Sequence, residues 1–411
     1  MKQLFMLWAA LATFSSCANG KSSMKVTVTN PLAIERVGEM VEVPMNVVTA
    51  RLHLSDTAEF VVLNADDVEV PYQVTYDGLV IFPVQVAAGG KSAYTLRTGQ
   101  PKPVDVLACG KYYPERLDDV AWENDLVAFR TYGPALQKRG ERAFGYDVFT
   151  KNNTSKPVVE ARYAEELSQE KRARAAELRK TDPKAASALL RSISYHIDHG
   201  NGMDCYSVGP TLGGGTAALM EGDTILYPYC YRTQEILDNG PLRFTLKLEF
   251  NPLTVRGDSN VVETRLITLD AGSYLNKTVV SYTNLKGDMP IVTGIVLHDN
   301  GPVVADAPQG YITYVEPTDH PDGENGQMFM GAAFPAPVQE AKPVLFSAQE
   351  KKQRAGADGH LLAISRYEPG SQYTYYWGSA WSKGAIKTAN SWNKYMAQYA
   401  QEVRTPLVVK Y

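Results

Sequence analysis

Short segments in which apolar and polar residues alternate fill the chain from Met24 to Gln100. When glycine, proline, asparagine or aspartate separates them, such segments are typical of strands with one buried face. The segments with this pattern are MKVTVTN, VEVPMNV, EFVVL and SAYTLRT. In VPYQVTYDGLVIFPV, the pair Asp77-Gly78 predicts a β-hairpin with a type I′ turn. We therefore expect a small N-terminal β-sandwich over residues 24–103, which ends in a proline-containing linker.

The alternating pattern returns beyond Arg243. It is found in FTLKLEF, VVETRLITL, KTVVSYTNL and IVTGIVLH, and the aromatic segment YTYYWGSAWSKG follows near the end of the chain. Because no helical pattern separates these segments, they favour a large antiparallel β-sandwich over a doubly wound α/β fold. We assign residues 104–411 to this domain and expect it to end in a helix over 391–401 and the strand PLVVKY. The expected fold class is mostly β.

One long helical pattern interrupts the large domain, at residues 158–193. This stretch is rich in alanine, glutamate, arginine, leucine and lysine, and it contains no glycine. Asp182 and Pro183 predict a break, with Asp182 as the N-cap of a second helix and Pro183 in its first turn. The apolar face is narrow, so we expect a helical insert on the surface. A membrane-lying helix is disfavoured because acidic and basic residues are interspersed.

The first residues have the layout of a secretory signal, which we assign to residues 1–23. An apolar run from Leu4 to Phe14 follows one lysine and precedes small residues, and it is too short to span a bilayer. Cys17 follows this run as in a bacterial lipobox, although Phe14 stands where leucine is commonest. We expect lipidation of Cys17, with simple cleavage near Ser16 as the alternative. The expected location is the periplasm or the outer membrane, with the lipid on Cys17 as the membrane contact.

Three further cysteines, Cys109, Cys205 and Cys230, leave two interpretations open. In an exported chain, Cys205 and Cys230 could form a disulfide if a hairpin brings their strands together. The alternative is three buried thiols. No CxxC spacing occurs, which disfavours a zinc site built on cysteine.

Composition and missing motifs exclude several classes of function. The 411 residues carry a net charge of −4, so no nucleic-acid-binding surface is indicated. A GxGxxG motif after a strand, a Walker loop and a GxSxG motif are absent, and the Gly213–Gly215 run precedes a strand-like segment rather than a helix. The HxxH spacing of His196 and His199 is a weak metal signal. No cofactor is predicted. A structural Ca²⁺ ion held by oxygen atoms of the loops remains an alternative.

The segment from Ser194 to Phe244 concentrates side chains that can transfer protons. Acid–base catalysis needs such groups within hydrogen-bond reach of a substrate, and one more histidine, His298, ends the segment IVTGIVLH. A structural hydrogen bond is the alternative role for each histidine, and core packing is the alternative for each tyrosine. The candidate catalytic residues are His196, His199, Tyr206, Glu235 and His298.

Aromatic residues are mixed with charged residues between Lys111 and Lys151, as is typical of a sugar site. Aromatic rings stack on the apolar face of a pyranose, while carboxylates and guanidinium groups bind its hydroxyl and acid groups. Core packing of the rings and solvation of the charges is the alternative. The candidate substrate-binding residues are Trp122, Glu123, Arg130, Tyr132, Asp204, Tyr229, Tyr231, Arg243 and Trp377. We expect residues 122–132 and 196–243 to converge on one cleft.

Two reaction classes fit these side chains. Proton abstraction beside the carboxylate of a uronic acid needs a base and a cation or protonated acid that neutralises the carboxylate. The residues that meet this requirement are His196 or His199, Tyr206, Arg130 and Arg243. Hydrolysis of a glycosidic bond needs two carboxyl groups instead. The candidates for that role are Glu123, Asp204, Glu235 and Asp238.

Several long segments resemble one known family. They are YYPERLDDVAWENDLVAFRTYGPAL, ERAFGYDVF, GMDCYSVGPTLGGGTAAL, YPYCYRTQEILDNGPLRFTL and WGSAWSKG. Together they resemble the bacterial domain-of-unknown-function family 4861 from about Val26 to Tyr411. Members are typically exported proteins of gut and marine Bacteroidetes, often encoded beside polysaccharide-degrading enzymes. The resemblance implies a galactose-mutarotase-like β-supersandwich and a glycan substrate, whereas the insert from Glu160 to Lys184 departs from the family pattern.

The function expected from the residues and the resemblance is an exported carbohydrate-active enzyme. Its substrates would be acidic, uronic-acid-containing glycan fragments, and its chemistry that of a polysaccharide lyase. A glycoside hydrolase, a sugar mutarotase or epimerase, and a non-catalytic glycan-binding lipoprotein are the alternatives. The expected partners are oligosaccharide or polysaccharide fragments.

Overall fold

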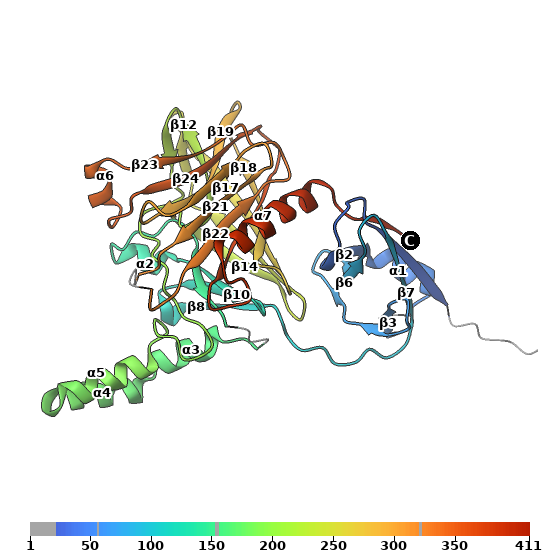
Figure 1. Ribbon diagram of the computed structural model, residues 1–411, viewed down its shortest axis with the longest axis horizontal. Helices are drawn as coiled ribbons and strands as arrows, with labels where there is room; N and C mark the ends of the chain where they lie inside the picture. Colours follow the sequence, from blue (N-terminus) through green and yellow to red (C-terminus); the bar gives the residue numbers. More distant parts are fainter. Residues whose placement is uncertain (1–21, 56, 153–155, 320–322) are drawn as a thin grey trace, which may run out of the picture.

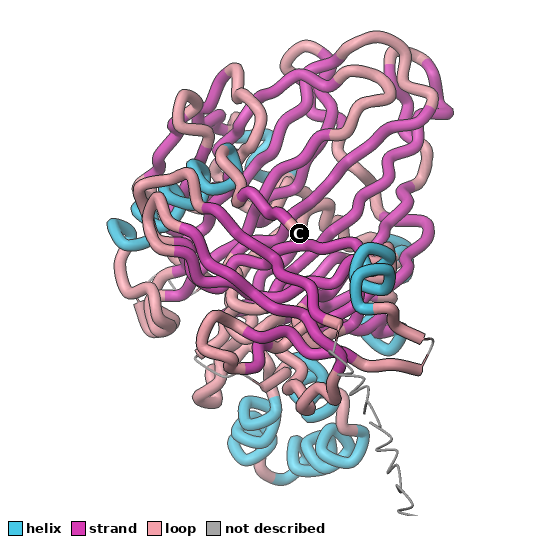
Figure 2. The backbone as a smooth tube through the Cα atoms, turned by 90° about the vertical axis from the view of Figure 1, so that its right-hand side faces the viewer, coloured by secondary structure: helices cyan, strands magenta, loops and turns pink. Residues whose placement is uncertain are grey.

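The computed structural model describes residues 22–55, 57–152, 156–319 and 323–411. Residues 1–21 of the predicted signal, which include Cys17, therefore lie outside the described residues, whereas Ser23 already belongs to the first strand. Figure 1 shows an N-terminal domain, a larger domain built mainly of strands, and a helical arm that extends from the larger domain. The tube in Figure 2 shows how strands predominate throughout. The predicted mostly-β fold is confirmed.

The N-terminal domain is a small sandwich of two sheets. Its sheets have the strand orders β26-β1-β7-β3-β4 and β2-β6-β5, and alternate residues of their strands, such as Val26, Val43, Phe82 and Leu96, form its core. Its elements are β1 (Ser23–Thr29), β2 (Arg36–Pro44), α1 (Met45–Leu52), β3 (Phe60–Leu63), β4 (Glu69–Val70), β5 (Gln73–Val74), β6 (Leu79–Val86) and β7 (Lys91–Thr98).

Two details of this domain differ from the prediction. The segment VEVPMNV was expected to be a strand, but β2 ends at Pro44 and α1 follows directly. The helix forms because Val48 and Leu52, one turn apart, are both buried against the sheets. The predicted hairpin joins β5 to β6, but Asp77 lacks the positive φ that a type I′ turn requires at both central residues; Gly78 alone has it, at 76°.

The end of the chain belongs to the N-terminal sheet. Strand β26 (Val408–Lys410) pairs with β1, with Thr27 opposite Lys410. The sequence analysis placed this strand in the large domain, because its own residues do not indicate which sheet edge it joins. Nη1 of Arg36 also donates a hydrogen bond to the carbonyl of Thr405, at 3.1 Å. The N-terminal domain is thus attached to the large domain by two separate segments of the chain (Figure 1).

The large domain contains three sheets, named here the side, facing and large sheets. The side sheet contains β8 (Cys109–Tyr113), β9 (Asp119–Glu123), β10 (Val127–Thr131) and β11 (Asp147–Thr150). The facing sheet contains β13 (Thr224–Leu226), β12 (Gly214–Glu221), β19 (Met289–Leu297), β24 (Gly359–Tyr367) and β23 (Glu340–Leu345). The large sheet contains β14 (Tyr231–Asn239), β15 (Arg243–Phe250), β17 (Asp258–Asp270), β18 (Leu275–Thr283), β25 (Tyr373–Trp381), β22 (Met328–Ala333), β21 (Tyr311–Glu316) and β20 (Val303–Asp306), in this spatial order, and β16 (Leu253–Val255) pairs with β17.

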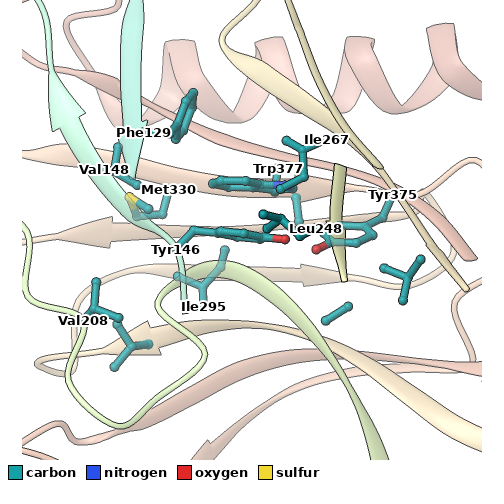
Figure 3. Packing of buried hydrophobic residues seen from close by; sticks show 14 of the residues in the cluster. Phe129, Tyr146, Val148, Val208, Leu248, Ile267, Ile295, Met330, Tyr375 and Trp377 are labelled. Carbon is teal, nitrogen blue, oxygen red and sulfur yellow. The ribbon is translucent and has the colours of Figure 1, made fainter. Parts of the chain in front are cut away.

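The three sheets enclose one core, in which aromatic rings pack among aliphatic side chains (Figure 3). Trp377 of β25 stacks on Tyr146 with ring centroids 4.1 Å apart, and the edge of Phe129 from β10 meets it at 4.9 Å. The glycine run at the start of β12 permits this packing: a Cβ on Gly215 would lie 2.7 Å from the Cβ of Trp377. These glycines therefore allow a close approach between segments.

The helices lie outside the sheets. The insert was expected to break once, at Asp182; the structure has that break, with Asp182 capping the next helix, and another at Ser168, which caps α4. Helix α7 covers the outer face of the large sheet at β21 and β22. The remaining elements are η1 (Pro114–Arg116), α2 (Pro134–Lys138), α3 (Val159–Glu166), α4 (Gln169–Thr181), α5 (Pro183–Ile193), α6 (Ala348–Gln353) and α7 (Ala389–Arg404).

Candidate functional site

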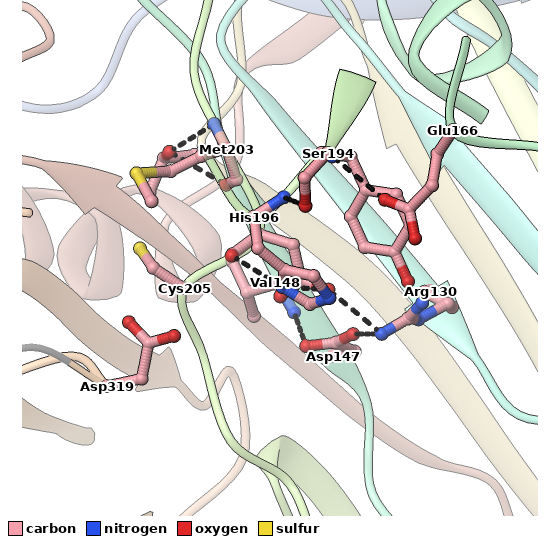
Figure 4. A network of polar contacts seen from close by, with 12 residues as sticks. Arg130, Asp147, Val148, Glu166, Ser194, His196, Met203, Cys205 and Asp319 are labelled. Atoms are coloured by element: carbon pink, nitrogen blue, oxygen red, sulfur yellow. Dashed lines mark hydrogen bonds and ion pairs between the residues drawn. The ribbon is translucent and has the colours of Figure 1, made fainter. Parts of the chain in front are cut away.

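A buried cation, Arg130, is the centre of a polar cluster on the outer face of the side sheet (Figure 4). Its Nη2 donates to Asp204 Oδ2 at 3.1 Å and to the hydroxyl of Tyr132 at 3.2 Å. The same nitrogen also donates to Asp147, and Nη1 lies 3.6 Å from Asp119 Oδ2. We call these five residues the Arg130 cluster. Its chemistry is that of one guanidinium shared among three carboxyl groups.

Strand alternation explains why these side chains meet. Arg130 lies directly opposite Asp147 in the β10–β11 ladder, so both point to the same face of the side sheet. Their neighbours along the strands, Phe129 and Val148, point to the other face and enter the core. Asp204 arrives from outside the sheet, through a bridge between its backbone and Phe149 of β11.

Burial changes the protonation of this cluster. Burial raises the pKa of Asp119 to about 7, even though Arg130 and Arg116 counteract it. Burial and the charge of Asp147 raise the pKa of Asp204 well above its ordinary range. Three ionised carboxylates around one guanidinium would leave excess negative charge in a buried site. Asp119 and Asp204 therefore keep their protons to higher pH than ordinary carboxyl groups do.

The raised pKa of Asp119 predicts a pH-dependent stability. Between about pH 4 and pH 7 the folded state keeps a proton that the unfolded state has lost, so this group's contribution to stability falls as the pH rises. Asp119→Asn mimics the protonated carboxyl group. The decrease in Tm from pH 5 to pH 8, measured by scanning calorimetry, should therefore be smaller in this variant than in the wild type. The control is Asp105→Asn, at an exposed position, which should leave the fall unchanged. An equal fall in Asp119→Asn and in the wild type would contradict this assignment.

The two histidines near Asp204 have different surroundings. Nδ1 of His196 lies 3.1 Å from the carbonyl oxygen of Asp204 and 3.8 Å from its carboxylate, and the His196 side chain is 50% exposed. A carbonyl only accepts, so Nδ1 carries the hydrogen and Nε2 is the basic nitrogen of the neutral ring. His199 is exposed, and its Nε2 lies 3.0 Å from the carbonyl of Ser194. His196 thus lies at the edge of the Arg130 cluster, whereas His199 is bonded within its own loop.

A second polar group, His298 with Glu316, joins two sheets at one end of the sandwich. His298 directly follows β19 of the facing sheet, and Glu316 is the last residue of β21 of the large sheet. Nδ1 of His298 lies 2.8 Å from Glu316 Oε2. Burial lowers the pKa of His298, but the hydrogen bond and negative charge of Glu316 outweigh it, so the pKa is raised. The Glu316 carboxylate fixes the tautomer in which Nε2 is the basic nitrogen.

Tyr206 lies beside this pair. Its ring centroid is 6.0 Å from that of His298, and the two rings are nearly perpendicular. Its side chain is 6% exposed, and among the described residues its hydroxyl has no hydrogen-bond partner. Burial raises the pKa of Tyr206 well above its ordinary value. A buried hydroxyl without a partner is costly in a folded protein, and no other described residue holds the proton of this one.

The two groups are parts of one region, because residues 204–206 connect them. Asp204 contacts Arg130, and Tyr206, two positions along, contacts His298. The backbone N–H of Asp319 donates to the carbonyl of Cys205 at 3.2 Å, which ties the segment after β21 to this stretch (Figure 4). We call this region the candidate site.

The expected aromatic platforms are not available to a sugar. Trp122 and Trp377 each have an exposed fraction of 0%. The indole N–H of Trp122 donates to Asn276 at 2.8 Å, and that of Trp377 to Thr278 at 2.8 Å. Both were nominated for stacking on a substrate; they are instead core residues, because they point to the inner faces of their sheets.

Glu235 and Arg243 also lie away from the candidate site. Glu235 is in β14, and six strand steps separate β14 from β21 in the large sheet, which is roughly 29 Å along the sheet. Arg243 bonds Asp270 at 2.6 Å and Glu42 of the N-terminal domain at 2.7 Å. Arg130 and Arg243 were both expected to bind the acid group of a substrate, but carboxylates of the protein occupy them.

The other nominated side chains serve structural contacts. Glu123 accepts from Lys151 Nζ at 2.6 Å and from the N–H of Val159 at 2.9 Å, so it caps helix α3. Tyr231 donates to the carbonyl of Asp118. Tyr229 is 47% exposed. None of these contacts involves the candidate site.

Cys109, Cys205 and Cys230 are free thiols in the described part of the chain, so Cys205 and Cys230 do not form a disulfide. Cys205 contacts the sulfur of Met328 at 3.7 Å, whereas Cys230 contacts Asn251. Burial raises the pKa of Cys109 and Cys230 to about 11. The alternative of three buried thiols therefore holds for Cys205 and Cys230, whereas Cys109 is only half-buried.

Three cavities formed by described residues are lined by no histidine. A small pocket lies against Asp204, between Phe149, Val159 and Tyr195. Larger cavities, of about 500 and 330 Å³, lie at the domain interface and on the outer face of the large sheet. Among the described residues, no three His, Cys, Asp or Glu side chains are grouped to hold a metal, and no helix is long and apolar enough to cross a membrane.

Glu316, Asp119 and Asp147 were not among the candidate residues of the sequence analysis. Each lies in a strand in which every residue is buried: DVAWE, DVFT and YITYVE. Charged groups are buried only when they are paired. An acidic residue inside an otherwise apolar strand was therefore the available signal.

Comparison with known proteins gives one relative of similar length. The "Uncharacterized protein P7" of Formosa agariphila is 27% identical over 432 residues, which cover 100% of this chain and 99% of that protein.

Two solved structures from Enterococcus faecalis resemble the fold weakly. A protein in glycosyl hydrolase family 38 is 8% identical with a TM-score of 0.45, and the match covers 95% of this chain and 47% of that one. An alpha-mannosidase is 9% identical with a TM-score of 0.41, over 95% of this chain and 46% of that one. The chain spans about half the length of these two proteins.

The family comparison covers nearly the whole chain. The model of DUF4861, a domain of unknown function, matches residues 28–409. The resemblance seen in the sequence is therefore confirmed, and the chain belongs to the DUF4861 family.

Proposed function

We propose that this protein is an enzyme that cleaves acidic, uronic-acid-containing glycan fragments by acid–base chemistry, as a lyase. The observation that carries the proposal is the His298–Glu316 pair beside the unpartnered hydroxyl of Tyr206. A base and an acid with separate pKa values, held next to each other, are what an elimination requires.

The proposed reaction is a β-elimination. His298 Nε2 removes the proton on the carbon next to the uronate carboxylate. The electron pair of that C–H bond forms a C=C bond, the bond from the neighbouring carbon to the glycosidic oxygen breaks, and Tyr206 gives its proton to that oxygen. The products are one unsaturated uronide and one new reducing end. The atoms and electrons of this reaction balance without an external oxidant or a metal.

The protonation states of the two residues fit these roles. Donation of Nδ1–H to Glu316 leaves Nε2 of neutral His298 as the base. The raised pKa of Tyr206 keeps its hydroxyl protonated, so it can act as the acid. The substrate carboxylate needs a partner other than Arg130, whose three carboxyl neighbours occupy it. We assign that role to His196, which is half exposed on the same segment.

The experiment that tests the proposal uses a panel of uronic-acid oligosaccharides. A lyase generates an unsaturated product that absorbs in the ultraviolet, together with new reducing ends in equal number. Reducing ends without absorbance would indicate a hydrolase, and neither signal would indicate a binding protein. Either of these two results would overturn the lyase assignment.

A glycoside hydrolase is the second candidate, and one observation favours it. Burial raises the pKa of Asp119 to about 7 and that of Asp204 well above its ordinary range. A carboxyl group protonated near neutral pH is what a hydrolase needs as its general acid. The reducing-end assay described above separates the two candidates.

The pH dependence of turnover should depend on Glu316. If neutral His298 is the base, turnover rises with pH through the pKa of His298, which Glu316 holds above its ordinary value. Glu316→Gln removes that effect while burial still lowers the pKa, so the rising limb should move to lower pH and the maximum should fall. Steady-state kinetics between pH 5 and pH 9 measure this shift. If the rising limb of the pH profile of turnover does not move in Glu316→Gln, His298 is not the base.

We also propose that the protein is exported and anchored by a lipid on Cys17. The support is the apolar run that ends just before Cys17. Cys17→Ser should move the protein from the membrane fraction to the soluble periplasmic fraction, as followed by detergent extraction and blotting. An unchanged distribution would rule out the anchor.

A further inference from the structure

The largest cavity described above has no role in the proposed reaction. It encloses about 500 Å³ between the N-terminal domain, the outer face of the large sheet and helix α7. Small-molecule sites typically enclose about 300–1,000 Å³ and often lie between domains. We call it the interdomain cavity. Its size is that of a site for a few sugar units.

Tyrosine rings form one wall of the interdomain cavity. Tyr376 comes from β25, and Tyr395 and Tyr399 come from α7. The rings of Tyr376 and Tyr399 are 5.5 Å apart and those of Tyr395 and Tyr399 are 5.8 Å apart, and all three are partly exposed. Contiguous tyrosine faces with polar ends are suited to stacking on pyranose rings.

Ion pairs also line the interdomain cavity. Arg36 is 2% exposed; it pairs with Glu39, and its Nε lies 3.6 Å from Glu402 Oε1. Arg243 pairs with Glu42 and Asp270. These carboxylates keep lone pairs that can accept hydrogen bonds from sugar hydroxyls. Because arginines already neutralise them, they need no cationic ligand.

One buried nitrogen at this cavity has unused hydrogen-bonding capacity. Nε of Arg36 lies 3.6 Å from Glu402 Oε1, which is too far for a hydrogen bond, and it has no other hydrogen-bond partner among the described residues. Oε2 of Glu39, whose pKa burial raises, pairs with Nη2 of Arg36 instead. Buried polar groups in native proteins are normally satisfied, so the Nε donor points to a ligand with hydroxyl groups.

We propose that the interdomain cavity binds a neutral oligosaccharide, at a site separate from His298. Carboxylates outnumber cations among the lining residues, so a polyanionic glycan is repelled while a neutral pyranose is not. The ligand contacts both domains and therefore stiffens their arrangement. This inference does not depend on the proposed lyase reaction, because it concerns binding at other residues.

The test blocks the cavity without removing any of its walls. Gln398 is exposed on α7 and lines the cavity, so Gln398→Trp fills the space. Lys277→Trp fills it from the large sheet. The control is Gln401→Trp, on the same helix, at an exposed position that does not line the cavity. Binding of neutral gluco-, xylo-, manno- and galacto-hexasaccharides to the full-length protein is measured by titration calorimetry, with a hexagalacturonide for comparison.

The expected result is binding of at least one neutral hexasaccharide, with a dissociation constant raised more than tenfold by Gln398→Trp and by Lys277→Trp and unchanged by Gln401→Trp. Unchanged binding in both cavity variants would overturn the proposal. So would the absence of binding by every neutral hexasaccharide, or a preference of this site for the hexagalacturonide. None of these readouts requires turnover, so failure here is distinguishable from failure of the lyase assignment.

Discussion

Replacing His298 with alanine is expected to lower turnover of an acidic glycan by about a hundredfold to ten-thousandfold, the usual cost of removing a positioned acid or base. The side chain is 20% exposed and bonds Glu316, so its loss affects the candidate site more than the core. Tyr206→Phe should give a loss of similar size, because the phenol has no partner whose loss would disturb the fold. Single-turnover absorbance measurements report both effects on the chemical step.

The matched control for His298→Ala is His199→Ala. From the sequence, the candidates for the base were His196 and His199. In the structure its ring is exposed and bonds the carbonyl of Ser194, so the control should keep nearly full turnover. If His199→Ala abolishes turnover and His298→Ala does not, the catalytic base lies on the loop that carries His199, and the mechanism proposed here fails. Circular dichroism spectra confirm that each variant is folded.

Replacing Arg130 with methionine is expected to lower the free energy of unfolding by about 3–5 kcal/mol, as for other buried ion pairs that lose one partner. The variant removes the cation that pairs with the buried carboxyl groups of Asp119, Asp147 and Asp204. The loss should be smaller at pH 5 than at pH 8, because protonated carboxyl groups need no counter-charge. Urea denaturation at the two pH values measures both quantities.

An exposed arginine provides the control for that experiment. Arg232 pairs with Glu249 on the surface and is 48% exposed, so Arg232→Met should cost about 0–1 kcal/mol. A loss below about 1 kcal/mol in Arg130→Met would mean that the cluster relaxes or admits water. In that case its raised pKa values would have no structural basis.

Local sequence determined most of the secondary structure. Strands β1, β7 and β17 follow from alternation over neighbouring residues, and the end of α4 follows from Asp182 and Pro183. These features depend on residues that are close in the chain, so their physical causes are present in the sequence itself. The polar character of residues 194–206 was likewise visible before the fold was known.

Tertiary structure alone decided which of these residues meet. Glu316 joins His298 from a strand of a different sheet, 18 positions along the chain, and Arg130 meets Asp204 across 74 positions. Trp122 and Trp377 could equally have formed a sugar platform, because an aromatic ring serves either purpose. The face of the sheet on which a ring lies decides between them, and both rings lie on faces that pack into the core. That choice depends on how the sheets stack, which no local pattern encodes.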